Sequence, residues 1–244
     1  MGIKIFHFTN AGLLFDCSKK ILIDGIYGGD NVIQEAGMSD MTADSIKDLM
    51  ENRGVFSSVD LVLFTHQHID HYNKMVVDQY LSKNEGVGFF APGDKRNNIA
   101  ANQIEQGVFS LGVEDVELYA FFTKHQYTGD DKEKIEHLSY LLNFEGKSFF
   151  VAGDGVLDLC SCQMVRKYSG TRKLFCFFNV MHIAERTGIK IIEYLKPEKI
   201  LIYHLPLKSD DVFNYYAIVR QAKKNYLKKG IVLEVVKHLK YETY

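Results

Sequence analysis

Short apolar runs and stretches of helical spacing alternate along the whole chain. In the first two thirds, β-branched and aromatic runs bounded by Gly, Asn, Asp or Lys predict strands. These strands are expected at residues 3–8, 12–17, 20–23, 59–64, 87–90, 116–122, 138–144 and 148–152. Apolar positions three or four apart predict helices at residues 41–52 and 72–82. The run Phe144-Glu145-Gly146-Lys147 predicts a hairpin turn between two of the strands.

The last third has strands and helices in turn. Strands are expected at residues 174–178, 199–203 and 231–235, and helices at 183–194 and 210–227. Strand-rich segments that alternate with helices in both halves indicate an α/β protein whose sheets are covered by helices. Only three prolines occur and no Pro/Gly/Ser-rich linker divides the chain, so residues 1–244 are expected to form a single domain.

Composition and charge narrow the choice of partners. The hydrophobic fraction of 46% and the charged fraction of 25% are those of an ordinary soluble domain. The formal net charge of −2 argues against a nucleic-acid-binding role, although a local basic patch is compatible with it. No apolar run has the length of a signal peptide or a membrane span, so a cytoplasmic protein without a membrane span is expected, and an oligomer is compatible with the sequence. The four cysteines, which include Cys160 and Cys162, are expected to be free thiols.

The chemistry of the chain is concentrated in Thr65-His66-Gln67-His68-Ile69-Asp70-His71, directly after the expected strand at 59–64. Side chains at alternate positions of an extended segment point the same way, so His66, His68 and Asp70 can converge. His71 needs a bend, which the start of the next helix could supply. Imidazoles suit zinc and iron, and a carboxylate among them broadens the choice toward manganese and favours a second ion. The segment therefore predicts a metal site at the carboxyl end of a strand.

This segment resembles the signature of the metallo-β-lactamase superfamily, in which His-x-His-x-Asp-His follows a buried strand. Three further segments are similar to that family: IFHFTNAGLLFDCSKKILIDG at the N-terminus, the strand ending in Gly153-Asp154, and the late strand ending in Tyr203-His204. The arrangement looks closest to the lactonase- and phospholipase-like branch. True β-lactamases typically have Cys where Asp154 stands, so antibiotic hydrolysis is not expected. The resemblance implies a four-layer αβ/βα sandwich.

The resemblance also implies two metal sites that share Asp154. One ion would be bound by His66, His68, a third histidine and Asp154. The other would be bound by Asp70, His71, Asp154 and His204. His125 and His137 compete for the place of the third histidine. We assign His125, because relatives usually carry this ligand in the loop before the strand that precedes Gly-Asp, and His137 is then expected beside the site or in contact with substrate.

Weaker expectations concern the surroundings of the site. Asp24 ends a strand and could accept the second N–H of a ligand histidine, with an ordinary turn-forming Asp as the alternative. His7 and His182 could line the pocket, and Asn179 is a further candidate, whereas His238 in the Lys-rich C-terminal segment is expected to face solvent. Loops at residues 27–38 and 127–136 are expected to set specificity.

Two divalent ions, with zinc expected first and manganese, iron or nickel also compatible, would make a metal-bridged hydroxide available at neutral pH. Asp70 would bind an ion and orient this nucleophile. The expected function is therefore hydrolysis of a small-molecule ester, lactone or phosphodiester. Two alternatives stay open: an RNA or DNA phosphodiesterase, and a di-iron redox enzyme on the same fold. A non-catalytic metal-binding scaffold would be expected to lack ligands that this chain has.

Overall fold

The computed structural model describes residues 2–28, 37–126, 135–184 and 186–244. The expected specificity loops at 27–38 and 127–136 fall largely outside this described part. The chain divides into two compact units, and each contains one β-sheet and its own helices. Unit 1 comprises residues 1–99, 204–213 and 237–244, and unit 2 comprises residues 100–203 and 214–236. Whether the whole chain behaves as a single domain stays a prediction.

The sheet of unit 1 has six strands in the order β14-β1-β2-β3-β4-β5. The strands of this sheet are β1 (Lys4–His7), β2 (Leu13–Asp16), β3 (Lys20–Ile23), β4 (Leu61–Leu63), β5 (Gly88–Phe90) and β14 (Lys240–Thr243). The pairs β14–β1, β1–β2 and β2–β3 are antiparallel, whereas β3–β4 and β4–β5 are parallel. The carboxyl ends of β3, β4 and β5 therefore lie at one edge, which is where polar segments follow each strand.

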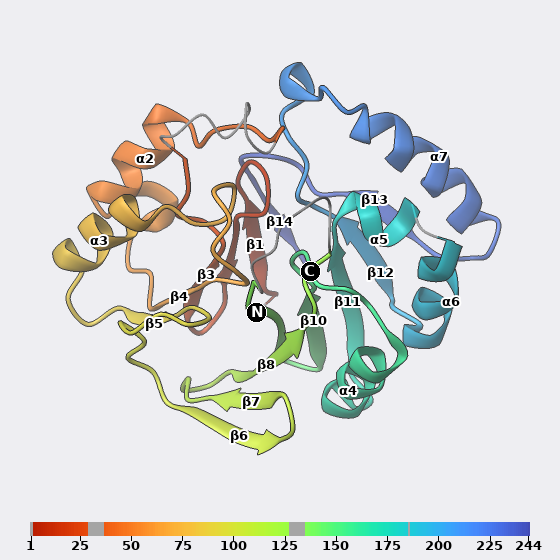
Figure 1. The fold of residues 1–244 in the computed structure, drawn as a ribbon, viewed down its shortest axis with the longest axis horizontal. Coiled ribbons are helices and arrows are strands. Elements are labelled where there is room, and N and C mark those ends of the chain that lie inside the picture. The colour runs from red at the N-terminus through yellow and green to blue at the C-terminus, as the bar shows by residue number, and fades with distance from the viewer. Residues whose placement is uncertain (1, 29–36, 127–134, 185) are drawn as a thin grey trace. The chain divides into compact units, whose positions relative to one another are not determined.

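Two helices cover one side of this sheet, as Figure 1 shows: α2 (Ala43–Met50) and α3 (Lys74–Lys83). A short 3₁₀ turn, η1 (Gly54–Phe56), follows α2, and a second, η2 (Lys208–Asp210), lies in the returning segment. Leu49 of α2 and Tyr80 of α3 join Phe89 and other apolar side chains in one buried cluster. Thr42 and Asn73 cap the two helices by accepting backbone N–H groups, which explains why each helix starts two residues later than predicted.

The sheet of unit 2 has eight strands in the order β13-β12-β11-β10-β9-β8-β7-β6. They are β6 (Ala101–Glu105), β7 (Val108–Leu111), β8 (Glu117–Thr123), β9 (His137–Phe144), β10 (Lys147–Val151), β11 (Lys173–Phe178), β12 (Lys199–Ile202) and β13 (Leu233–Val235). From β10 to β13 the pairing is parallel, and from β6 to β10 it is antiparallel. The predicted hairpin joins β9 to β10, with Glu145 and Gly146 both at positive φ as a tight turn requires.

The helices of unit 2 are α4 (Leu159–Ser169), α5 (Val180–Ala184), α6 (Arg186–Leu195) and α7 (Tyr215–Leu227). The predicted helix at 183–194 corresponds to two helices, α5 and α6. The predicted helix at 210–227 is wrong in its first five residues. Asn214 adopts a left-handed backbone conformation, which interrupts an α-helix, so α7 begins at Tyr215. Within the described residues, no helix has both the length and the apolar character needed to cross a membrane.

Candidate metal centre

Unit 1 gathers the His-rich segment at the carboxyl edge of its sheet. β4 ends at Leu63, and Phe64 and Thr65 lead into His66, which is fully buried. His68 Nδ1 lies 3.0 Å from His66 Nε2. Two nitrogens bound to one tetrahedral zinc ion lie about 3.3 Å apart, given bonds of about 2.0–2.1 Å. The separation in the structure therefore fits two imidazoles that share an ion.

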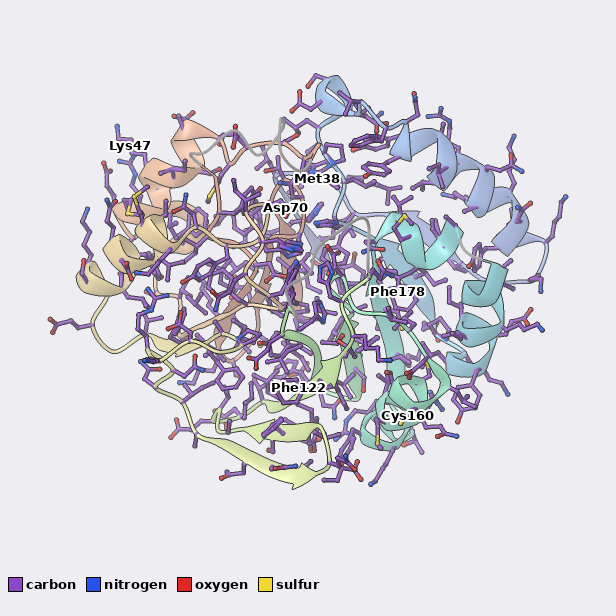
Figure 2. All side chains as sticks on the ribbon, in the orientation of Figure 1. Met38, Lys47, Asp70, Phe122, Cys160 and Phe178 are labelled. Atoms are coloured by element: carbon purple, nitrogen blue, oxygen red, sulfur yellow. The ribbon has the colours of Figure 1, made fainter. Side chains whose placement is uncertain are left out.

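A second group of ligand atoms lies in the same unit. Asp70, His71 and His204 each offer one ligand atom, and these atoms lie within 4.8 Å of one another. Asp70 Oδ2 is 3.1 Å from His204 Nε2 and 3.8 Å from His71 Nε2. All three residues are buried, and Figure 2 places Asp70 among crowded side chains, whereas Lys47 on α2 extends into solvent. Two such groups in one unit are consistent with two ions rather than one.

Asp24 stands behind these histidines at the end of the neighbouring strand β3. Its Oδ2 is 3.0 Å from His71 Nδ1, and both side chains are fully buried. The same carboxylate accepts hydrogen bonds from the backbone N–H and the hydroxyl of Thr65, each at 2.7 Å. A carboxylate at Nδ1 keeps a proton on that nitrogen and leaves the Nε2 lone pair of His71 for a metal.

Thr65 extends this control to a second histidine. Its hydroxyl donates to Asp24, so the same oxygen acts as acceptor for His66 Nδ1 at 3.0 Å. The proton of His66 is thereby held on Nδ1, and its Nε2 faces His68 as an acceptor. One buried carboxylate therefore sets the tautomers of two candidate ligands. Sequence reasoning did not single out Thr65, whose only signal was its place between the strand and His66.

Tyr27 lies near this group and is fully buried. Its hydroxyl donates to the carbonyl oxygen of Thr9 at 2.7 Å. Burial raises the pKa of Tyr27 well above its usual value, and the negative charge of Asp70 raises it further. The phenol therefore stays protonated and acts as a hydrogen-bond donor in unit 1.

Unit 2 brings its own candidates together after β10. The segment 124–126 pairs with 154–156 through the Gln126 N–H to Asp154 carbonyl bond (2.6 Å) and the His125–Gly155 bridge. This pairing places His125 Nε2 3.9 Å from Asp154 Oδ2. Gly155 has no room for a side chain, because a Cβ there would lie 2.7 Å from Thr123 Oγ1. The close approach of these two segments positions His125 and Asp154 side by side.

His137 has a different place in unit 2. Its Nε2 accepts the backbone N–H of Asp154 at 3.0 Å, so Nδ1 carries the proton and donates to Thr123 Oγ1 at 2.7 Å. His137 therefore supports the turn that carries Asp154 through Nε2, while Nδ1 fixes the ring to the end of β8. His125, whose Nε2 faces the Asp154 carboxylate, is the better candidate for the ligand.

Asn179 and His182 also contact this turn. Asn179 Nδ2 donates to Asp154 Oδ1 at 2.8 Å and to Gln126 Oε1 at 2.9 Å, which fixes the orientation of the carboxylate. His182 Nε2 lies 2.7 Å from the carbonyl oxygen of Gly155, and its Nδ1 accepts the Asn179 N–H at 3.1 Å. His182 thus supports this turn, and its predicted place in the pocket lining stays a prediction.

The remaining two histidines meet in unit 1. His7 is fully buried and its Nε2 lies 2.8 Å from the carbonyl oxygen of Asn10. The prediction that His238 faces solvent is wrong. Its ring lies 4.8 Å from the ring of His7, and its Nδ1 bonds the carbonyl oxygen of Phe8 at 3.0 Å. The reason is strand β14, which follows directly and pairs with β1, so the C-terminal segment is docked on the sheet.

Comparisons with known proteins bear on the fold and on the class of the protein. No family model matches the chain. A "UPF0173 metal-dependent hydrolase" of Pyrococcus furiosus is 26% identical over 96% of this chain and 100% of its own length. The metallo-β-lactamase fold protein YhfI from Bacillus subtilis superimposes over the full length of both chains with a TM-score of 0.57, at 12% identity. The chain therefore has the metallo-β-lactamase fold and is similar over its whole length to a curated metal-dependent hydrolase.

Two further solved structures share the fold of this chain. An isothiocyanate hydrolase from Delia radicum gut bacteria is 14% identical, covers 99% of this chain and 98% of its own, and has a TM-score of 0.63. CmlA, a diiron β-hydroxylase from Streptomyces venezuelae, is 14% identical with a TM-score of 0.61, and the match spans all of this chain but 54% of CmlA. At these identities the likeness establishes the fold, so the predicted α/β fold of the metallo-β-lactamase type is confirmed.

Proposed function

We propose that this chain is a metal-dependent hydrolase that cleaves a small-molecule ester, lactone or phosphodiester. The observation that carries the proposal is the buried group Asp70, His71 and His204, with Asp24 fixing the tautomer of His71. The Pyrococcus relative is named a metal-dependent hydrolase. The sequence of this chain predicts the same class of enzyme.

The donor set fits divalent ions. Imidazole nitrogens and a carboxylate suit zinc, manganese and iron, and we propose two ions with zinc as the first candidate. His66 and His68 would serve one ion, and Asp70, His71 and His204 the other. As the family resemblance implies, we propose that His125 and Asp154 supply the remaining ligands. Divalent ions in such sites lower the pKa of bound water and polarise the bond to be cleaved.

The protein's own groups prepare the reaction. Asp24 and Thr65 hold protons on the Nδ1 atoms of His71 and His66. Asp70 projects a carboxylate oxygen between two imidazoles, where it can orient an attacking water. In unit 2, Asn179 holds the carboxylate of Asp154 in one orientation. These contacts pre-set the site before substrate binds, which is the main contribution a scaffold makes to metal catalysis.

The test combines metal analysis with a substrate panel. The purified chain should bind up to two zinc ions, and it should hydrolyse at least one member of a panel of phosphodiesters, esters and lactones. Asp70→Ala should lower kcat by at least about a hundredfold, as expected when a charge-stabilising group is removed. Asp48→Ala serves as control, because Asp48 pairs with Arg53 on the surface of unit 1 and should leave activity unchanged. Full activity in Asp70→Ala, or activity without any metal, would refute the proposal.

The likeness of fold to CmlA keeps a redox reaction as the second candidate. Oxygen consumption by the iron-loaded chain, with no turnover of the hydrolase panel, would favour that alternative. Turnover of an RNA or DNA substrate in place of small molecules would favour a nucleic-acid phosphodiesterase.

A further inference from the structure

A buried turn after β1 is bonded directly to the segment that carries His204. Asn10 is fully buried and adopts a left-handed backbone conformation with φ of +55°. Its backbone N–H donates to the carbonyl oxygen of Leu205 at 3.2 Å, and its carbonyl oxygen accepts the N–H of His204 at 2.9 Å. His7 Nε2 reaches the same carbonyl oxygen at 2.8 Å. The backbone of Asn10 therefore holds His204 inside unit 1.

The side chain of Asn10 holds the same segment by a second route. Its Oδ1 accepts the Ser39 N–H at 3.0 Å and its Nδ2 donates to the Ser39 carbonyl oxygen at 2.6 Å. The hydroxyl of Ser39 accepts the N–H of Leu207 at 2.7 Å and donates to Asp210 Oδ2 at 2.6 Å. Residues 204–210 are thus anchored at His204 through Asn10 and, farther along, through Ser39.

His204 needs such an anchor. Its own φ is +53°, a conformation that costs free energy in a residue with a large side chain. This conformation is what places His204 Nε2 3.1 Å from Asp70 Oδ2. We infer that Asn10, together with Ser39, is a positioning residue that holds the His204 imidazole against Asp70 in the metal centre. The inference rests on the proposed function in so far as His204 is taken to bind a metal.

The variants remove the side-chain bonds of this anchor, keep the two backbone bonds between Asn10 and residues 204–205, and leave every proposed ligand in place. Asn10→Gly keeps the left-handed backbone and loses both bonds to Ser39, because glycine adopts positive φ without strain. Ser39→Ala removes only the hydroxyl bonds to Leu207 and Asp210, and it keeps the inference testable if Asn10→Gly folds poorly. Asn52→Gly is the matched control. Asn52 also has a positive φ, of +49°, but it is exposed and its side chain accepts only from Ser58 among the bonds described.

Two measurements decide the matter. The first is amide hydrogen exchange at His204 and Leu207 in the metal-free protein, resolved by NMR. Leu207 should exchange at least about tenfold faster in both Asn10→Gly and Ser39→Ala, and His204 should exchange faster in Asn10→Gly, whereas Asn52→Gly should change neither amide. The second is titration with Co²⁺, whose visible spectrum reports on the ligands. Removing the support of a ligand typically costs about 10- to 100-fold in metal affinity. The Co²⁺ site to which His204 contributes is identified by its loss in His204→Ala. Both variants should bind Co²⁺ at that site about 10- to 100-fold more weakly than the wild type.

The outcomes separate the two proposals. If both variants exchange these amides at the wild-type rate and bind Co²⁺ within twofold of the wild-type affinity, the role of Asn10 and Ser39 is overturned. A wild-type chain that binds Co²⁺ but hydrolyses no substrate of the panel would refute the proposed function. Hydrogen exchange and Co²⁺ affinity of Asn10→Gly would still test whether Asn10 positions His204. A wild-type chain that binds no Co²⁺ would overturn the assignment of His204 as a metal ligand, while hydrogen exchange would still establish or refute the anchor itself.

Discussion

Replacing Asp24 by Asn tests whether one carboxylate sets the state of the metal ligands. Asp24 accepts from the Thr65 N–H, the Thr65 hydroxyl and His71 Nδ1. An asparagine has one acceptor oxygen and one NH₂ donor in nearly the same volume. If the oxygen keeps the Thr65 N–H, the NH₂ group faces His71 Nδ1. The imidazole then accepts at Nδ1 and moves its proton to Nε2, the atom that faces Asp70.

The magnitude follows from these contacts. A proton on His71 Nε2 prevents that nitrogen from binding a metal until the proton returns to Nδ1. Loss of such a supporting carboxylate typically weakens metal binding by about 10- to 100-fold. That factor equals about 1.4–2.8 kcal/mol, at 1.4 kcal/mol for each factor of ten. Because both side chains are fully buried, solvent should compensate little of the loss, and we expect the upper half of this range for Asp24→Asn.

The assay is zinc titration in competition with a chromophoric chelator. Thermal unfolding of the metal-free protein in parallel separates a loss of stability from a loss of affinity. Asp60→Asn is the matched control, because Asp60 precedes the other end of β4 and accepts the Lys20 N–H at 2.8 Å at an exposed site. A zinc affinity of Asp24→Asn within twofold of the wild type, with Asp60→Asn unchanged, would refute the tautomer argument.

Three further predictions follow from single contacts. His125→Ala should lose bound metal, whereas His137→Gln should keep the metal and lower the melting temperature, since His137 supports a backbone turn. Metal analysis of both variants tests this prediction, and the reverse pattern would make His137 the ligand. Burial lowers the pKa of His238 below its usual 6.5, so the unfolded chain takes up the proton first and stability is lost as pH falls below about 6.5. Denaturant titrations at pH 7.5 and 5.5 should show a smaller pH-dependent loss in His238→Gln, and an equal loss would contradict this. Phe150→Ala, at a fully buried position, should cost about 3–5 kcal/mol of unfolding free energy, and Phe122→Ala, at 51% exposure, well under half of that; equal costs in urea titration would contradict the packing argument.

The elements that could be predicted were those with a strong apolar signal. β3 and β4 follow from runs of consecutive apolar residues, and the structure buries residues 21–23 of β3 and all of β4. β6 and β14 were missed because their side chains are mostly exposed, so no apolar pattern marks them. α4 was missed as well: it has buried Cys162 and Val165 among polar residues, which is a weak helical period, although Asp158 caps it.

The residues of the candidate site also fall into those that the sequence could predict and those that it could not. The His-rich segment could be recognised because metal ligands must be particular residue types at fixed spacing. Thr65, Asn10 and Ser39 carry no such signal, since their roles depend on which backbone groups the fold brings to them. Asn10 had one indirect sign, a turn of Asn, Ala and Gly after a strand, where asparagine tolerates positive φ.

Three residues that are proposed metal ligands or support them lie in strained turns of the backbone. Asp24, Asn10 and His204 all adopt left-handed backbone conformations, with φ of 50°, 55° and 53°. Each turns the chain sharply, Asp24 at the end of β3, Asn10 in the turn between β1 and β2, and His204 just after β12. Such conformations persist only where surrounding bonds over-determine them, and at each of the three the backbone N–H is bonded, to Leu63, Leu205 and Asn10. The free energy stored in these turns is therefore balanced by the bonds that aim the ligands. It follows that variants which keep a turn but remove its supporting bonds, such as Asn10→Gly, should lose metal affinity by a larger factor than they lose stability of the metal-free fold, because glycine adopts the positive φ without strain.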